Sequence, residues 1–248
     1  MSALRARCPD CRTLTAVAIG PDYQCHACGR EFVAGLVRVP AAWGAGGEGM
    51  VEAARLPLPW PEAAVVEEPT LEDQIATLGR TMPARPLVLG GCCCAHMGAI
   101  RALARAGRLG VVWIDAHGDL NTPESSPTGN LWGMPLRMLL AAGDVAPADV
   151  TLLGTRALDA PEAEFIRLSG IRTELGELPE RVYVAVDLDV ALPEDVDVLF
   201  PVAGGAPLAE LETLLAGIPT PAGAGFSGLL ASERNAVTVT RLARALGL

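Results

Sequence analysis

The chain contains the stretch Leu109-Gly110-Val111-Val112-Trp113-Ile114-Asp115-Ala116-His117-Gly118-Asp119-Leu120-Asn121, in which an apolar run passes directly into alternating polar side chains. Alternate residues of an extended strand point to the same side, so we expect Asp115, His117 and Asp119 to converge where the strand ends. A second apolar run, at 182–186, leads in the same way into Asp187 and Asp189. These five potential ligands exceed what one divalent ion needs, so the two runs predict a hydrolytic site with two metal ions.

Short apolar runs alternate along the chain with stretches of helical periodicity. The expected strands are 35–39, 63–66, 86–89, 110–114, 150–153, 182–186 and 225–230, and the expected helices are 71–79, 97–106, 131–141, 161–168, 207–215 and 238–246. This alternation predicts an α/β fold over residues 35–248, with three layers (α-β-α) and a mostly parallel sheet covered on both faces. Ligand sites in such sheets lie at the carboxyl ends of the strands, where the acidic clusters are expected. Residues 40–60, rich in Gly, Pro and Ala, predict a long loop over that edge.

Residues 1–34 are expected to form a separate small unit, because two CxxC turns lie within this segment. The cysteines are Cys8, Cys11, Cys25 and Cys28, and Gly29 lets the chain turn after the second pair. Four thiolates in this spacing predict a tetrahedral structural zinc site, and the segment resembles a zinc ribbon. It contains few arginines, so we expect docking or contacts between copies of the chain rather than nucleic-acid binding.

The composition restricts the partners of the chain. Its 248 residues allow one substantial α/β domain with a short appendage. The net charge of −10 argues against nucleic-acid binding and favours cationic ligands. All 19 basic residues are arginine, which excludes Schiff-base lysine chemistry and a P-loop lysine. We find no signal-like segment and no stretch that approaches a membrane span, so the expected location is the cytoplasm.

Three further motifs end at the same predicted edge of the sheet. They are Gly90-Gly91-Cys92-Cys93-Cys94, Thr128-Gly129-Asn130-Leu131-Trp132-Gly133-Met134-Pro135 and Ser232-Glu233-Arg234-Asn235. With residues 115–121 and 187–189, their order resembles the ureohydrolase (arginase/agmatinase) family, which carries GGDH, DAHxDxN, SGNxHGMP and DxDxxDP motifs and a late glutamate. The resemblance covers residues from about 35 to 248, and the match to DAHxDxN is highly specific.

The resemblance implies a binuclear metal centre, with manganese as the first expectation and zinc or iron as alternatives. Asp115 and Asp187 would bridge the two ions. His117 and Asp189 would complete one site, and Asp119 would serve the other. The metal pair would activate a water molecule near neutral pH for attack on a guanidinium carbon.

One metal-ligand position departs from the family pattern. The residue aligned with the histidine of GGDH is Cys93, whose thiolate prefers zinc or iron to manganese. Cys93 then either keeps an ion with altered affinity or leaves that site half-occupied. His96 lies three residues further on, where a capping or packing role in the next helix is favoured over a role as replacement ligand.

The resemblance also implies residues for catalysis. Asp119 matches the carboxylate that hydrogen-bonds the activated water, and Glu233 matches the glutamate that holds the guanidinium in a bidentate pair. The shuttle histidine of SGNxHGMP is replaced by Trp132. Indole has no nitrogen that titrates near neutrality, so Trp132 instead forms an apolar wall or stacks on a planar guanidinium.

Substrate selection rests on three positions. Asn121 and Thr128 match residues that contact an α-carboxylate in arginases, and Asp159 matches the aspartate that receives the α-amino group. Asp159 equally fits the N-cap of a helix, and both interpretations stay open. The expected substrate is a small linear guanidino compound, arginine or a modified arginine such as N-hydroxyarginine. It would be cleaved to urea or a urea derivative and an amine. The family also implies a homo-oligomer.

Two alternatives compete with this hypothesis. The first is a single-zinc, deacetylase-like amide hydrolase on the same fold, which would use Asp115, His117 and Asp187. The second is a catalytically degenerate domain with a docking role, suggested by the replacement of two family histidines. Against the second alternative, burial of the remaining carboxylates without an ion would be energetically unfavourable.

Overall fold

A seven-stranded sheet organises most of the chain in the computed structural model, which describes residues 5–6, 8, 11, 13, 15–19, 22–33 and 35–248. Its strands in spatial order are β6 (Glu62–Val65), β5 (Gly35–Val39), β7 (Pro86–Gly90), β11 (Gly223–Ser227), β10 (Val182–Asp187), β8 (Gly110–Ile114) and β9 (Val150–Leu153). Every neighbouring pair is parallel. The predicted α/β architecture is confirmed.

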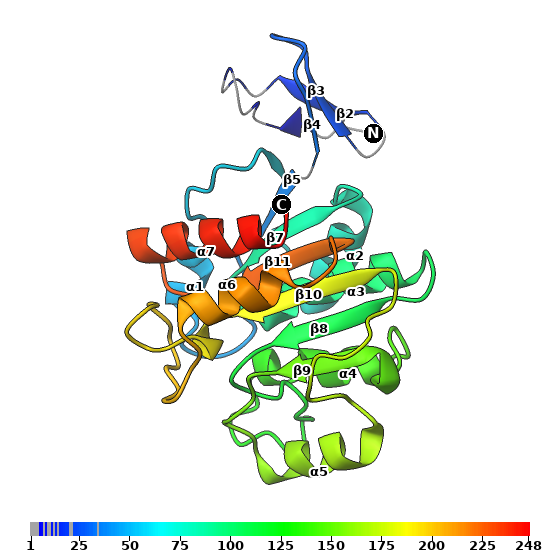
Figure 1. The fold of residues 1–248 in the computed structure, drawn as a ribbon, viewed down its shortest axis with the longest axis vertical. Helices are drawn as coiled ribbons and strands as arrows, with labels where there is room; N and C mark the ends of the chain where they lie inside the picture. The colour runs from blue at the N-terminus through cyan, green and yellow to red at the C-terminus, as the bar shows by residue number, and fades with distance from the viewer. Residues whose placement is uncertain are drawn as a thin grey trace.

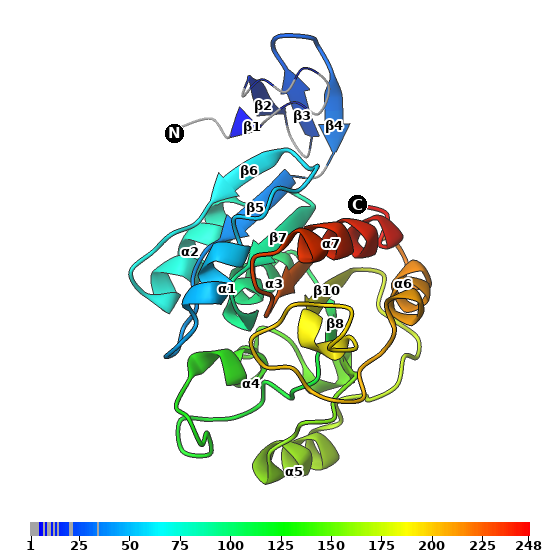
Figure 2. The ribbon, with the colours of Figure 1, turned by 90° about the vertical axis from the view of Figure 1, so that its left-hand side faces the viewer.

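Helices cover both faces of this sheet, as alternate residues of one strand illustrate. In β8, Val111 and Trp113 join one apolar core, whereas Val112 and Ile114 join the other. The first core is covered by α2 (Leu71–Thr81), α3 (Met97–Ala104), α4 (Pro135–Ala141) and α5 (Ala160–Ser169), and the second by α6 (Leu208–Ala216) and α7 (Glu233–Ala245). Figures 1 and 2 show α6 and α7 side by side on one face of the sheet. A strand that is apolar on both sides therefore lies in the middle layer.

In two segments the kind of element, and not only its bounds, differs from the sequence prediction. The stretch 40–60 contains a short helix, α1 (Glu48–Ala53), whose Met50 and Ala53 are buried. The segment 131–141 is divided into a 3-10 turn, η2 (Leu131–Gly133), and α4, which begins at Pro135 because proline suits the first position of a helix. Burial of two apolar side chains, rather than helix propensity, stabilises α1.

The N-terminal segment forms a second, antiparallel sheet. It consists of β1 (Arg5–Ala6), β2 (Ala16–Ile19), β3 (Asp22–Cys25) and β4 (Glu31–Val33). Figure 1 shows this small sheet at the end of the molecule where β5 enters the large one. Throughout the part of the chain described above, no helix combines the length and the apolar character that crossing a membrane requires.

Candidate metal centre

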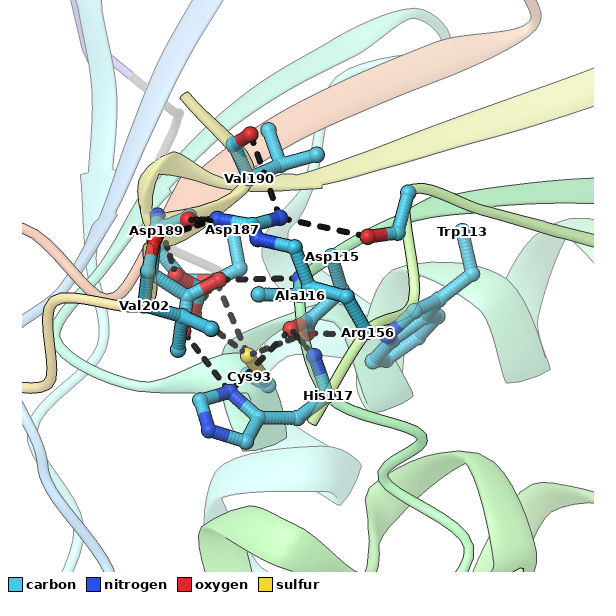
Figure 3. A network of polar contacts seen from close by, with 12 residues as sticks. Cys93, Trp113, Asp115, Ala116, His117, Arg156, Asp187, Asp189, Val190 and Val202 are labelled. Atoms are coloured by element: carbon cyan, nitrogen blue, oxygen red, sulfur yellow. Dashed lines mark hydrogen bonds and ion pairs between the residues drawn. The ribbon is translucent and has the colours of Figure 1, made fainter. Parts of the chain in front are cut away.

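The carboxyl ends of β7, β8 and β10 meet around one cavity of about 560 Å³. All six side chains predicted as metal ligands line it: Cys93, Asp115, His117, Asp119, Asp187 and Asp189. Cys93 begins a 3-10 turn after β7 (η1, Cys93–His96), and Asp187 ends β10 before the turn η4 (Leu188–Val190). The strand order brings these segments together although 94 residues separate Cys93 from Asp187. Figure 3 shows their side chains pointing toward one another.

The first group of potential ligands consists of Cys93, Asp115 and Asp187, each with a ligand atom within 4.8 Å of the others. The Cys93 thiol donates a hydrogen bond to Oδ2 of Asp187 at 2.9 Å, and its sulfur lies 3.7 Å from Oδ2 of Asp115. The indole N–H of Trp113 donates to the same oxygen of Asp115 at 3.3 Å. A sulfur therefore lies among carboxylate oxygens at ligand spacing.

The second group consists of Asp115, His117 and Asp189, again with atoms within 4.8 Å of one another. Nδ1 of His117 lies 2.7 Å from Oδ2 of Asp189 and 3.6 Å from Oδ1 of Asp115. Backbone groups orient these carboxylates: the N–H of His117 donates to Asp115 at 2.7 Å, and that of Ala116 donates to Asp189 at 3.0 Å. Asp115 belongs to both groups, so its carboxylate is placed where it could bridge two neighbouring ions.

Asp119 lies on the wall of the same cavity with an unusual backbone conformation. Its φ of +53° makes it the single non-glycine residue with positive φ among the described residues. Its Oδ2 atom is buried and has no hydrogen-bond partner within that same set. A strained residue that holds a buried, unsatisfied acceptor toward a cluster of ligands fits a role in cation binding or proton transfer.

The electrostatics of the cluster also fit a cation. Asp115, Asp119, Asp187 and Asp189 are all buried. Burial, followed by the charge of Asp189, raises the pKa of Asp187 to about 7, and burial with the charge of Asp115 raises the pKa of Asp189 to about 6. Hydrogen bonds to Asp115 and Asp189 raise the pKa of His117 to about 11. Buried carboxylates of this number are stabilised in their charged form by a divalent ion, so the donor set fits the metal pair.

Arg156 fixes the loop that follows β10, a role that the sequence did not indicate. Its guanidinium donates to five backbone carbonyl oxygens, those of Gly154, Asp189, Val190, Val202 and Ala203. Figure 3 shows the guanidinium beside Asp189 and Val190. Because arginine has five N–H donors, none is left for a ligand. Arg156 therefore orients the backbone of Asp189 and leaves the cavity without a free guanidinium of its own.

The predicted substrate-binding residues Asn121, Thr128, Trp132 and Asp159 line the outer part of the cavity. The Asn121 amide donates to Oδ2 of Asp159 at 2.8 Å. Asp159 is also the N-cap of α5, and its backbone N–H donates to Glu162 at 2.9 Å. Both interpretations of Asp159 are thus compatible in one structure. The Trp132 ring lies 6.0 Å from that of Phe200, so this part of the wall is aromatic.

Two residues considered as site residues lie elsewhere. Glu233 is exposed in the first turn of α7 and does not line the cavity. The chain enters α7 directly after Ser232, whose hydroxyl accepts from the N–H of Asn235, and this places Glu233 at the positive end of a helix dipole. His96 is fully buried, does not line the cavity, and forms hydrogen bonds with the hydroxyls of Tyr183 and Ser227.

The N-terminal segment contains a separate group of four cysteines. Cys8, Cys11, Cys25 and Cys28 place their sulfur atoms within 4.8 Å of one another. The sulfurs of Cys8 and Cys28 are 3.6 Å apart, and those of Cys11 and Cys25 are 3.5 Å apart. Four converging sulfurs match the donor set of a structural zinc ion.

Comparison with known proteins agrees with this geometry. The profile of the Arginase family matches residues 63–226. The arginase of Bacillus caldovelox is 37% identical over 167 residues, which cover 54% of this chain and 54% of the relative. The arginase of Staphylococcus aureus (strain COL) is 43% identical over 99 residues, covering 36% of this chain and 33% of that protein. The chain thus spans about half or less of the length of the curated relatives it matches.

Solved structures resemble the fold over a longer range. The crystal structure of Bacillus subtilis arginase superimposes with a TM-score of 0.72 at 22% identity, covering 86% of this chain and 97% of that one. The native Bacillus caldovelox arginase structure at pH 5.6 gives 0.70 at 25% identity with the same coverage. The profile match extends over well more than half of the chain and includes both groups of potential ligands, and the chain therefore belongs to the arginase family.

Proposed function

We propose that the chain is a binuclear metal-dependent amidinohydrolase that cleaves a linear guanidino compound to urea, or a urea derivative, and an amine. The observation that carries this proposal is the pair of ligand groups that share Asp115 on the wall of one cavity. A single ion needs one such group. The second group, with Cys93, therefore favours two ions over the single-zinc amide hydrolase.

The residues that would hold the metals combine these two groups with the pattern that the family implies. Asp115 and Asp187 would bridge, His117 and Asp189 would complete one half, and Cys93 with Asp119 would complete the other. Manganese is the first expectation from the family, with zinc or iron as alternatives because of the sulfur ligand. When bound, the pair supplies a nucleophilic water near neutral pH.

The chain itself would supply the proton acceptor and the charge that draws in the substrate. Oδ2 of Asp119 is buried without a partner among the described residues and can accept the proton of the attacking water. Asp159 and Glu162 add negative charge to the cavity wall, whereas Arg156 has no free N–H donor. A cationic guanidinium is favoured by this field. Arginine and N-hydroxyarginine remain the first candidates within this class.

The replacement by Trp132 predicts a preference between guanidino compounds that differ in the basicity of their leaving amine. Indole cannot protonate a leaving amine, so a substrate whose leaving group is a weaker base should react faster. The aromatic wall of Trp132 and Phe200 would instead position the planar substrate. The predicted guanidinium partner Glu233 is exposed, so the carboxylates that line the cavity are better placed for this contact.

The test of the function is product release from a panel of guanidino compounds. We expect metal-dependent formation of urea or hydroxyurea from at least one of arginine, N-hydroxyarginine and agmatine, in the presence of manganese, zinc or iron. Trp132→His should raise turnover of arginine about 10-fold or more, because general acid catalysis contributes about 10²–10⁴-fold. Asp119→Asn is the inactive control. Absence of product from every compound and metal would contradict the proposal and favour the catalytically degenerate domain.

We further propose that Cys8, Cys11, Cys25 and Cys28 bind one structural zinc ion. Cys25→Ser should remove about one zinc per chain and unfold the small antiparallel sheet, because classical zinc modules are unfolded without metal. Cys92→Ser is a matched control outside this cluster and should keep that zinc. Metal analysis and proteolysis of the N-terminal segment measure the two effects. Unchanged zinc content in Cys25→Ser would exclude this site.

A further inference from the structure

Three buried polar side chains, linked by hydrogen bonds, lead from the interior of the sheet to the Cys93 side of the cavity. His96 is fully buried, with Nδ1 3.1 Å from the hydroxyl of Tyr183 and Nε2 3.1 Å from the hydroxyl of Ser227. Tyr183 and Ser227 are also fully buried. They belong to β10 and β11, and His96 ends the turn η1 that Cys93 begins.

Ser227, the last of these three side chains, faces two of the potential ligands. The Ser227 hydroxyl lies 3.3 Å from the sulfur of Cys93 and 3.5 Å from Oδ2 of Asp187. When the sulfur is a thiolate and the carboxylate is charged, both groups accept hydrogen bonds and neither donates one. A Ser227 hydroxyl that bonds either group must then donate to it, which is its direction in the contact with Oδ2 of Asp187. Ser227 consequently accepts from Nε2–H of His96, and Nδ1 of His96 accepts from the hydroxyl of Tyr183.

The residues around His96 and Tyr183 leave space for these polar side chains. A Cβ atom at Gly225 would lie 2.7 Å from Nδ1 of His96 and 2.8 Å from the hydroxyl oxygen of Tyr183. The His96 ring is also held edge-on against Trp113, with centroids 5.6 Å apart. Burying three polar side chains is unfavourable unless each is hydrogen-bonded, and apolar residues would fill the same space without that requirement. These three polar side chains therefore fit a role in donating a hydrogen bond to a group at the cavity.

We infer that Tyr183, His96 and Ser227 are positioning residues that hold Cys93 as a thiolate ligand and make its half of the centre selective for a zinc-class ion over manganese. A thiolate selects softer ions, and the Ser227 hydroxyl orients it by donating a hydrogen bond. The thiol proton is released to solvent when the ion binds. The inference rests on the metal binding in the proposed function and does not depend on which bond is hydrolysed.

Cobalt(II) titration of the full chain, with the N-terminal cluster first loaded with zinc, tests the inference. The difference between the spectra of the unsubstituted chain and Cys93→Ser isolates the thiolate-to-cobalt charge-transfer band. We expect Ser227→Ala to weaken cobalt binding at this site about 10- to 100-fold and to shift the band. Ser227→Thr, which keeps the hydroxyl, should retain both affinity and band position. Ser232→Ala, a serine at the start of α7 outside the cavity, should change neither.

A second measurement needs no substitution near the site. Nitrogen-15 NMR of the zinc-loaded chain should show His96 protonated on Nε2 and unprotonated on Nδ1. The inference is overturned if Cys93→Ser leaves the cobalt spectrum unchanged, if Ser227→Ala binds cobalt like the unsubstituted chain, or if His96 carries its proton on Nδ1. Spectral effects as expected, together with no guanidino hydrolysis, would instead reject the proposed function and leave this inference standing.

Discussion

Asp115→Asn is expected to remove both metal ions from the cavity and to abolish hydrolysis. Asp115 is the residue that the two ligand groups share, and it is almost fully buried. Asparagine keeps the shape of the side chain but removes a charge from a site that needs several negative ligands. We expect the metal content to fall from about three ions per chain to about one, the zinc of the N-terminal cluster. Turnover should fall about 10³-fold or more, which corresponds to about 4 kcal/mol.

Metal analysis after dialysis and a product assay measure these two losses. The matched control is Asp197→Asn, since Asp197 is half-exposed, lies 3.5 Å from the Arg234 guanidinium and does not line the cavity. This variant should keep its metals and its turnover. If Asp115→Asn retained two ions in the α/β domain, the shared-ligand arrangement would be wrong, whatever happened to the activity.

The stability of the metal-free chain should fall as the pH rises from about 5 to 8. The pKa of Asp187 is about 7 in the folded chain against an ordinary value of 3.8, and that of Asp189 is about 6. Between the ordinary and the folded values the native state binds more protons than the unfolded state, so the free energy of unfolding decreases with increasing pH. For Asp187 the change between pH 5 and 8 corresponds to about 3 kcal/mol, or a decrease in Tm on the order of 10 °C.

His117 adds to this trend at higher pH. Its folded pKa of about 11 lies above its ordinary 6.5, so its contribution to stability is complete below pH 6.5 and disappears as the pH rises through 11. Metal ions bind the deprotonated carboxylates, so added metal should raise Tm more at pH 8 than at pH 5.

Thermal unfolding at several pH values, with and without metal, checks this prediction. Asp187→Asn should flatten the pH dependence of the metal-free chain, because the neutral amide does not titrate. Asp197→Asn should leave it unchanged. A Tm of the metal-free chain that rises between pH 5 and 8 would show that the buried carboxylates are already charged in the folded state.

Much of the fold follows from local sequence patterns. The apolar run 110–114 is β8 residue for residue, and 182–186 is β10 without its final Asp187. The strand expected at 225–230 is instead Gly223–Ser227. It ends there because Gly228 adopts a φ of +74°, and a Cβ at this position would lie 2.0 Å from the Asp187 carboxylate. That close contact comes from the neighbouring strand, so no local pattern in the sequence reveals it.

The candidate site likewise combines features that local sequence patterns predict with features that they do not. The motif spacing predicted the side chains that line the cavity, because residue type and strand ends are local properties. It did not indicate Ser227, which contacts Asp187 from 40 residues away, or the role of Arg156, which donates to the carbonyl oxygen of Asp189, 33 residues away. It predicted Glu233 as a substrate-binding residue, and Glu233 is exposed in the first turn of α7 and does not line the cavity.

The sequence by itself indicated most of the strands, the candidate ligands and the family of this chain, because alternation and motif spacing act over a few residues. Only the tertiary structure decided which ligands meet, since the order β7-β11-β10-β8 is set by packing of the whole sheet between its helices. That order places the sulfur of Cys93 beside Asp187 and the hydroxyl of Ser227. The chemistry of the proposed second metal site therefore depends on contacts between residues 40 to 134 positions apart.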